Sequence, residues 1–334
     1  MQELTFVDKG LSQLKAVAEK ELSSVFFEGE SVAIKLHMGE AGNEHYLKPG
    51  FVKIIVDALK KIGARPFIFD SPVVYPGGRD TPAKYIDTAK EHGFSEETIG
   101  CPLVISNESI KVKGKHLGYG VCKDLVDADG VLVLTHAKGH TCSGYGGAIK
   151  NLGMGALTKE SKGDIHDAAN PEIMGDCVGC NACVKACPLQ ILKLENKKVV
   201  LNNDSCIGCS ICIQECKYEV LKPKVEMFDV LLSEGANAAH KNFKKSYYIN
   251  AVINISKKCD CFSDMNKNPI ILEDVGVLFG KDIVAVDKAS LDLINKKFGD
   301  NLFLKHNRKD PYEHVVYAAE IGMGKLDYAI NTIK

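Results

Sequence analysis

The chain has 334 residues, of which 45% are hydrophobic, so it is long enough for one large domain with an insert or for two ordinary domains. Its 42 Lys and Arg residues balance 43 Asp and Glu residues, and this balance gives no reason to expect nucleic acid or an anionic membrane as a partner. No apolar run reaches the roughly 18 residues of a membrane helix, and the N-terminus lacks a signal-peptide pattern. We therefore expect a cytoplasmic protein.

The first half of the chain alternates short apolar runs with amphipathic segments. In chain order, the expected elements are strand 31–39, helix 51–64, strand 66–71, helix 84–93, strand 101–106 and strand 130–139. Such alternation predicts an α/β fold built on a mostly parallel sheet with helices on both faces.

Polar side chains appear where these strands end, at His37, Asp70, His136 and His140. In open α/β sheets, ligands bind in the crevice outside the carboxyl ends of the strands. His37 and Asp70 are therefore candidates for binding a cofactor. The alternatives are a histidine that caps the following loop and an aspartate that starts a turn.

The stretch THAKGHTCSGYGGAIKNLGMG (135–155) combines two histidines, two lysines, one cysteine and six glycines. Gly144, Gly146 and Gly147 permit positive φ and close approach of a ligand, and a helix starting near Ala148 would point free N–H groups at an anion. These three glycines are candidates for binding a cofactor. The stretch matches neither the Walker A pattern nor the dinucleotide fingerprint, so it gives little support for phosphate binding alone.

The segment from about 175 to 222 interrupts this pattern, and eight of the chain's 13 cysteines fall within Cys177–Cys216. CVGCNACVKACPLQIL (177–192) aligns with CIGCSICIQECKYEVL (206–221), which indicates an internal duplication. A C-x₂-C-x₂-C-x₃-C run gives three thiolates to one cubane and the fourth to its neighbour.

The segment resembles a bacterial two-cluster ferredoxin over its whole length, so we expect two [4Fe–4S] clusters. Zinc, which four cysteines also bind, is the alternative. The expected ligands are Cys177, Cys180, Cys183 and Cys216 for one cluster, and Cys206, Cys209, Cys212 and Cys187 for the other.

After this insert, strand and helix patterns resume at 225–234, 247–256 and 281–298, and a final helix is expected over 311–322. The predicted division is an α/β domain whose two parts are 1–174 and 223–334, with a small α+β ferredoxin-like insert at 175–222.

A second cysteine motif, KKCDCF, lies at 257–262. Cys259 and Cys261 are two residues apart, so in an extended segment their thiols would lie on one side of the chain and could bind a soft metal. An additional metal ion is therefore possible at this pair, and two free thiols are the alternative.

The α/β segments, the glycine-rich stretch, the duplicated cysteine motif and KKCDCF together resemble a family of iron–sulfur centre proteins with an uncharacterised α/β domain. More locally, the pattern H…GYGGAIK…H is similar to the motif of the nickel-pincer lactate racemase. That resemblance implies an acid/base role for His140, tethering of a cofactor by Lys150, and nickel ligation by His166. A solvated lysine and two capped or surface histidines are the alternative.

Three functions remain open on these patterns. The first is an oxidoreductase of an anaerobe's cytoplasm that passes electrons from two [4Fe–4S] clusters to a small molecule or metal in a cleft of the α/β domain, with a ferredoxin-like or flavin protein as redox partner. The second is a non-catalytic electron-transfer or assembly module. The third is a redox-neutral isomerase with a tethered-nickel site. We favour the first, because clusters joined to a cleft make sense only if electrons reach it.

Overall fold

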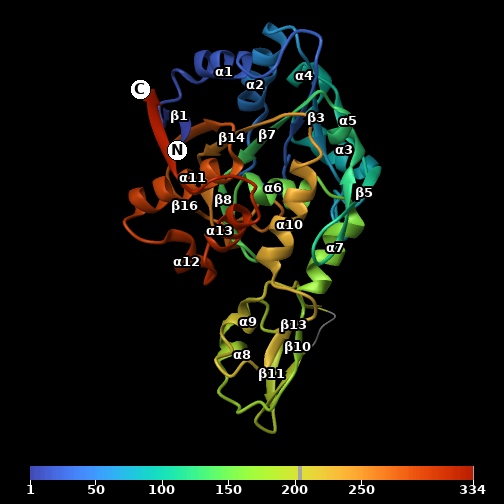
Figure 1. Ribbon diagram of the computed structural model, residues 1–334, viewed down its shortest axis with the longest axis vertical. Helices are drawn as coiled ribbons and strands as arrows, with labels where there is room; N and C mark the ends of the chain where they lie inside the picture. Colours follow the sequence, from blue (N-terminus) through green and yellow to red (C-terminus); the bar gives the residue numbers. More distant parts are fainter. Residues whose placement is uncertain (202–204, 334) are drawn as a thin grey trace.

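The computed structural model describes residues 1–201 and 205–333, and its centre is an eight-stranded sheet (Figure 1). Strand β17 runs antiparallel to both neighbours, and every other adjacent pair in this sheet is parallel. In spatial order, the strands are β18 (Tyr328–Ile333), β1 (Gln2–Asp8), β17 (Gly276–Gly280), β14 (Ser246–Val252), β7 (Gly130–His136), β2 (Ser31–Lys35), β3 (Arg65–Asp70) and β4 (Leu103–Ile105).

Helices cover both faces of this sheet, as the sequence predicts. The alternation along β7 shows why: Val131 and Val133 pack into one hydrophobic core, and Leu132 and Leu134 pack into the other. One core is completed by α1 (Leu14–Ser23), α2 (Pro49–Lys61), α3 (Pro82–Glu91) and α4 (Glu96–Ile99). The opposite core is completed by α5 (Lys123–Asp127), α6 (Ala148–Gly155), α7 (Lys159–Ala168), α10 (Phe228–His240), α11 (Ile283–Phe298), α12 (Leu302–Asn307) and α13 (Glu313–Glu320).

Helix α2 illustrates how sequence dictates these elements. Pro49 stands in its first turn, where a missing N–H costs nothing, and Gly63 ends it with φ +86°. The buried side chains between them include Val52, Ile55 and Leu59, which recur at helical spacing. Burial of each such side chain stabilises the fold by about 1.5–3 kcal/mol.

Two expected strands are shorter than their apolar runs. The strand expected over 31–39 ends at Lys35, and the one expected over 130–139 breaks after His136. The second break occurs because residues Lys138–His140 (β8) pair with Gly144–Gly146 (β9) in a hairpin of their own. Smaller pairs are formed by β5 (Ser109–Lys113) with β6 (Gly118–Cys122) and by β15 (Ile255–Ser256) with β16 (Ile270–Leu272), and Met265–Lys267 forms a 3-10 turn, η2.

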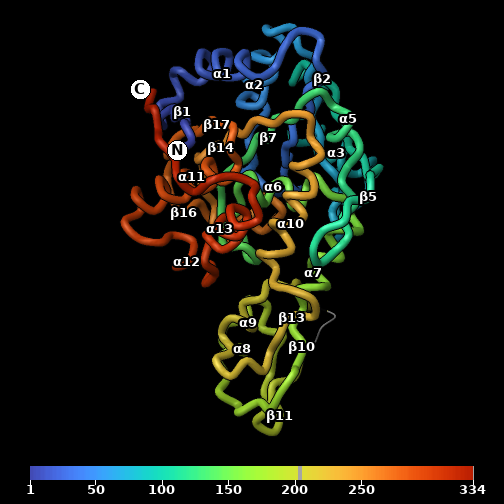
Figure 2. Tube along the Cα trace, in the orientation of Figure 1, coloured from blue at the N-terminus to red at the C-terminus, as the bar shows by residue number. Residues whose placement is uncertain are grey.

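The cysteine-rich segment forms a lobe that projects from the main body (Figure 1). The chain leaves α7, passes through the lobe and returns to α10 by two adjacent segments, β10 and β13, which pair with each other (Figure 2). The predicted domain boundaries at 174/175 and 222/223 stay a prediction. The lobe contains β10 (Pro171–Ile173), α8 (Ala182–Ala186), β11 (Leu192–Glu195), β12 (Lys198–Leu201), α9 (Ile211–Gln214) and β13 (Leu221–Pro223).

The two halves of the lobe repeat the same backbone conformation, which confirms the internal duplication. Positive φ recurs at each of three pairs of positions 29 residues apart: Gly179 and Gly208, Asn181 and Ser210, Gln190 and Glu219. A short helix follows Asn181 and Ser210 in turn. Left-handed backbone at non-glycine residues is uncommon, so the match is specific.

Across the part of the chain that the structure describes, no helix is both long enough and apolar enough to cross a membrane.

Candidate functional site

Polar side chains gather at the carboxyl ends of β2, β7 and β14, in a region named the cleft after the ligand crevice expected there. The chain runs outward from β2 to β3 and β4 on one side, and β7 and β14 lie on the other side, so the direction of winding reverses between β2 and β7. Such a switch point is where open α/β sheets bind ligands. His37 follows β2, His136 ends β7, and the loop containing Cys259 and Cys261 follows β14 and β15.

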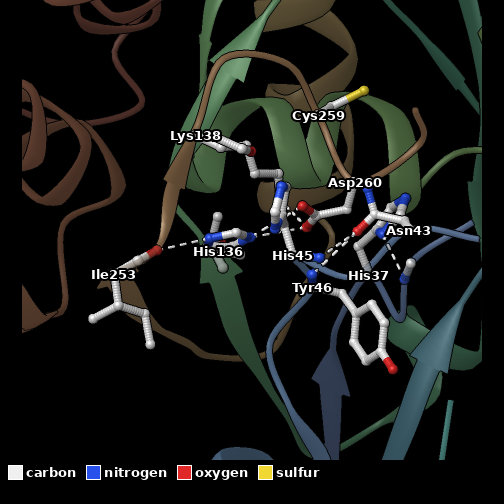
Figure 3. Close-up of polar contacts among 12 residues, drawn as sticks. His37, Asn43, His45, Tyr46, His136, Lys138, Ile253, Cys259 and Asp260 are labelled. Carbon is white, nitrogen blue, oxygen red and sulfur yellow. Dashed lines mark hydrogen bonds and ion pairs between the residues drawn. The ribbon is translucent and has the colours of Figure 1, made fainter. Parts of the chain in front are cut away.

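Asp260 anchors this loop from beneath. Its carboxylate is fully buried, and Oδ2 lies 2.8 Å from Nζ of Lys138 and 3.0 Å from Nδ1 of His136 (Figure 3). Burial alone would raise the pKa of Asp260, but His136 and Lys138 hold it far below its ordinary value. His136 donates from Nε2 to the Ile253 carbonyl at 2.8 Å, so both of its ring nitrogens face acceptors. The loop is therefore held by a buried ionic network.

The anchored loop is a tight turn, in which the Phe262 N–H donates to the Cys259 carbonyl at 3.0 Å. The expectation of an extended segment at KKCDCF is therefore wrong: Asp260 points inward to its ion pairs, and the chain bends around it. The sulfur of Cys259 points away from the Asp260 carboxylate (Figure 3).

The thiols of Cys259 and Cys261 interact with each other and face a group of cations. Sγ of Cys261 lies 3.2 Å from Nε2 of His37, which in turn lies 2.7 Å from Nη1 of Arg79. The hydrogen bond from Cys259 together with His37, Lys150 and Arg79 lowers the pKa of Cys261 well below its ordinary value, against the effect of burial. The pKa of Cys259 is raised, first by its hydrogen bond to Cys261. Of the two sulfurs, the neighbouring charges therefore favour ionisation of Cys261.

Arg79 is itself fixed by the surrounding loops. Its Nε forms a buried ion pair with Glu40 at 3.0 Å, and its Nη2 donates to the hydroxyl of Tyr75 at 2.5 Å. Burial lowers the pKa of His37, and the Arg79 cation lowers it further, so His37 is a neutral base next to the Cys261 sulfur.

Lys150 and His140 close the cleft on the side of the glycine-rich stretch. Burial opposes the charge on Lys150, but the Cys261 and Cys259 sulfurs raise its pKa. Within residues 1–201 and 205–333, Nζ of Lys150 has no hydrogen bond or ion pair to another side chain. Nδ1 of His140 accepts from the Ser143 hydroxyl at 3.0 Å, and burial together with Lys150 lowers the pKa of His140 well below its ordinary value. Lys150 is therefore a cation without a protein partner, beside a neutral histidine.

Asp70 lies beneath this cleft, in a buried ion pair with Lys35 at 3.0 Å. The Tyr85 hydroxyl also donates to its carboxylate, at 2.5 Å. Burial alone would raise the pKa of Asp70, but Lys35 and nearby cations lower it. The chain itself occupies this carboxylate, and a role of Asp70 in cofactor binding stays a prediction.

The three glycines have different neighbours. The helix expected near Ala148 begins there, but its first N–H groups donate to the carboxylate of Asp287, at 2.7 and 2.9 Å. A Cβ at Gly147 would lie 2.2 Å from Asp287, and one at Gly144 would meet the Lys309 carbonyl at 2.6 Å. Gly146 alone of the three borders both Lys150 and His140. The anion at this helix start is thus the protein's own aspartate, and cofactor binding by the glycines stays a prediction.

His166 joins the cleft to the lobe. Its Nδ1 lies 2.8 Å from the carbonyl oxygen of Ile207, the residue that follows Cys206. The approach is close, because a Cβ at Gly208 would lie 2.2 Å from the His166 carbonyl oxygen. The ring of Phe228 packs between the two histidines, with centroid distances of 5.2 Å to His166 and 6.4 Å to His140.

The eight lobe cysteines line two separate hollows, each of about 350 to 360 Å³. Cys180, at the hollow farther along the lobe from Ile207, is exposed, whereas Cys209 and Cys212 are buried. Burial raises the pKa of Cys209 to about 11, and the neighbouring thiols of Cys206 and Cys187 raise it further. The members are Cys177, Cys180, Cys183 and Cys216 in one hollow, and Cys187, Cys206, Cys209 and Cys212 in the other.

This grouping is the one that the sequence predicts, including the exchange of the fourth cysteine between the two halves. The structure also brings His37, His140 and Lys150 together with Cys259 and Cys261, and it places His166 between this group and the lobe. Among the described residues, no three His, Cys, Asp or Glu side chains are grouped so as to hold a metal ion. A metal at Cys259 and Cys261 stays a prediction.

Sequence reasoning missed Arg79, Glu40 and Asp260. Arg79 could have been found, because it is one of only three arginines and follows an expected strand within PGGRD. Nothing in the local sequence marks Glu40 as its partner. The inward direction of Asp260 depends on contacts with residues more than 120 positions away.

Comparisons with known proteins identify a family and a distant fold likeness. Residues 32–292 match the sequence model of a family described as Domain of unknown function (DUF362). None of the curated proteins matches the chain. The chain is similar to a Thermotoga maritima protein solved as a Northeast Structural Genomics Consortium target, with 8% identity and a TM-score of 0.44, over 92% of this chain and 58% of that one.

It is also similar to the lactate racemase apoprotein of Thermoanaerobacterium thermosaccharolyticum, with 12% identity and a TM-score of 0.37, over 75% of this chain and 50% of that one. The match thus spans between half and three fifths of the length of these two solved proteins. Membership of an iron–sulfur family stays a prediction.

Proposed function

The chain belongs to the DUF362 family, a domain of unknown function, and on that premise we propose that it is an iron–sulfur oxidoreductase. In this proposal the lobe is a ferredoxin-like module that holds two [4Fe–4S] clusters, and the cleft of the α/β body binds the molecule that is oxidised or reduced. A ferredoxin-like or flavin protein would exchange electrons at the exposed end of the lobe, near Cys180.

The fit of the lobe to two clusters rests on its donor set. Four thiols line each hollow, and the order of the cysteines matches the three-plus-one spacing of two-cluster ferredoxins. Burial, followed by the neighbouring thiols of the hollow, raises the pKa of Cys212, and a bound metal would supply the positive charge that thiolate ligands require. Bound there, the clusters would supply one-electron transfer at low potential.

The observation that carries the proposal is the contact between His166 and Ile207. It joins the backbone beside Cys206, a lining residue of one hollow, to the aromatic and histidine side chains that lead to Lys150. The lobe therefore approaches the cleft with its more buried hollow and leaves the other toward solvent. A carrier module that only met a separate protein would need no such contact.

The cleft residues suit an anionic small molecule. Lys150 has a retained positive charge and no protein partner, so an anion would replace the missing interaction. Burial lowers the pKa of His140 and of His166, and both are therefore neutral imidazoles at neutral pH.

Anaerobic purification with analysis of metals tests the proposal. We expect about eight iron atoms and about eight sulfides per chain, with a paramagnetic signal on reduction. Cys206→Ser should lose one cluster, whereas the matched control Cys101→Ser, in the body, should keep both. Stoichiometric zinc without sulfide would contradict the proposal. Reduced clusters that no oxidant can reoxidise through the cleft containing His140 and Lys150 would also contradict it.

A further inference from the structure

Cys259 and Cys261 lie outside the lobe and line neither of its hollows, and the Cys261 sulfur contacts His37, which in turn contacts the Arg79 cation. Both are partly exposed, so a small reagent can reach them. Electropositive and partly accessible surroundings of this kind are typical of reactive cysteines, whereas structural cysteines are buried in apolar surroundings. Cys101, which is 2% exposed and whose pKa burial raises to about 11, is an example of the second kind.

The two residues are also close enough in the chain for their sulfurs to bond to each other. Residues two apart are separated by at most about 6.8 Å between Cα atoms, which is within the range that a disulfide spans. The turn closed by the Phe262 N–H and the Cys259 carbonyl bends the chain further. Asp260, held by His136 and Lys138, keeps the intervening residue fixed while the sulfurs face the cleft.

We propose that Cys259 and Cys261 form a redox-active dithiol, which reduces a small anionic disulfide bound beside Lys150. This inference rests on the proposed function for its source of electrons, since the clusters of the lobe would supply single electrons and the thiol pair would deliver them two at a time. Lys150 supplies the positive charge that selects an anionic substrate, and the attacking sulfur contacts His37, behind which lies the Arg79 cation.

The chemistry balances as thiol–disulfide exchange. The Cys261 thiolate attacks one substrate sulfur, the substrate S–S bond breaks, and a mixed disulfide forms as one product thiolate leaves. The Cys259 thiol gives its proton to the first product thiolate and attacks the Cys261 sulfur, which releases the second product thiolate and leaves a Cys259–Cys261 disulfide. Two electrons and one proton then restore the thiol and thiolate.

The peptide produced by trypsin makes the pair directly measurable, because residues 259–267 contain both cysteines and no other. The full-length protein is equilibrated with mixtures of reduced and oxidised dithiothreitol, quenched with acid, alkylated and digested. We expect this peptide to interconvert between a doubly alkylated form and a disulfide form. The disulfide form carries no alkyl group and is two hydrogens lighter than the unalkylated dithiol peptide, and no variant is needed. A peptide that stays fully alkylated under every oxidising mixture overturns the proposal, as does a stoichiometric metal that must be chelated before the thiols react.

A second arm tests the thiolate and the charge selection. At neutral pH, alkylation of Cys261 should be at least about tenfold faster than alkylation of Cys101, which lies alone in peptide 91–111. Dithiobis-nitrobenzoate, an anionic disulfide, should oxidise the pair faster than uncharged dithiodipyridine does. Equal alkylation rates, or a preference for the uncharged disulfide, overturn the proposal.

These assays use external thiols, so they separate the two proposals. A reversible pair in a protein without iron or sulfide would contradict the proposed function and leave the dithiol standing. An iron–sulfur protein whose Cys259–Cys261 pair does not react would contradict the dithiol and leave the proposed function standing.

Discussion

The lobe and the cleft treat cysteine in opposite ways. In the lobe, eight thiols stand close to one another with no side-chain cation among the lining residues of either hollow, and burial together with neighbouring sulfurs raises the pKa values of Cys209 and Cys212. In the cleft, two thiols are surrounded by His37, Arg79 and Lys150, and the pKa of Cys261 is lowered.

This difference teaches where each site obtains its positive charge. The lobe needs an external cation before its sulfurs can ionise, which suits metal clusters. The cleft already supplies the charge from its own side chains, which suits a free thiolate. The predictions below aim to break or sharpen this contrast, from the largest expected effect to the smallest.

Removal of metal should unfold the lobe and leave the body intact. The lobe core contains few residues beyond its cysteines, so the metal must supply most of its folding free energy. Tryptic cleavage at the exposed Lys185, Lys193 and Lys198 should accelerate at least about 100-fold in the chelated protein. Cleavage within α2 is the internal control. It is measured by mass spectrometry of the same digest and should not change. Equal resistance of the lobe to trypsin with and without metal would mean that the lobe, like the cleft, keeps its structure without an external cation.

Asp260→Asn should destabilise the body by about 3–5 kcal/mol, because it leaves the buried ammonium of Lys138 without its ion pair and weakens the contact to the buried His136 ring. Urea unfolding of the anaerobically purified protein, followed by circular dichroism, measures the change. Asp264→Asn is the matched control, since its pair with Lys267 is largely exposed and should matter little. A mild effect of Asp260→Asn would show that the thiol loop does not depend on its ionic anchor.

Lys162 gives the base of the cleft a pH dependence of known sign. Burial lowers its pKa to about 8, and Nζ donates to the Pro72 carbonyl at 2.6 Å. Between about pH 8 and the ordinary value of 10.5, the unfolded chain holds a proton that the folded chain has lost. The free energy of unfolding should therefore rise with pH across this window, by about 3 kcal/mol in total from this group.

Lys162→Met should remove that rise, and substitution of the exposed Lys90 by Met should leave it in place. Urea unfolding of the three proteins at several pH values between 7 and 10.5 compares the slopes. Identical slopes for all three proteins would place the Lys162 amine in contact with water.

Lys150→Gln should slow alkylation of Cys261 by iodoacetamide about tenfold at neutral pH, since loss of one nearby cation raises the pKa of the thiol. The exposed pair Lys123 and Asp127 offers the control, Lys123→Gln, which should leave the rate unchanged. An unchanged rate in Lys150→Gln would assign the charge compensation of the cleft to Arg79.

The sequence predicts the coarse features of the molecule well, because these depend on local patterns. Alternating apolar runs are sufficient to predict the mostly parallel sheet with helices on both faces. Cysteine spacing is sufficient to predict which cysteines line each of the two hollows. The rule that strand ends meet at one edge of the sheet also selects His37, since it follows β2 at the switch point.

What the sequence could not supply are pairings between distant segments. Asp287 takes the N–H groups at the start of α6, so the glycine-rich stretch does not offer them to a ligand. Glu40 fixes Arg79, and Asp260 turns the KKCDCF loop inward. Each of these interactions joins residues from different elements through buried charge, and no periodicity or short motif records such a partnership.

The central claim is that electrons entering the lobe reach the cleft. The most direct measurement oxidises the Cys259–Cys261 pair in the iron-loaded protein, adds a limited amount of dithionite anaerobically, and follows cluster absorbance together with the mass of peptide 259–267. The account predicts that the clusters return to their oxidised spectrum as the peptide gains two hydrogens, and that metal-free protein treated in the same way keeps its disulfide. Clusters that stay reduced beside an unchanged disulfide would contradict the account.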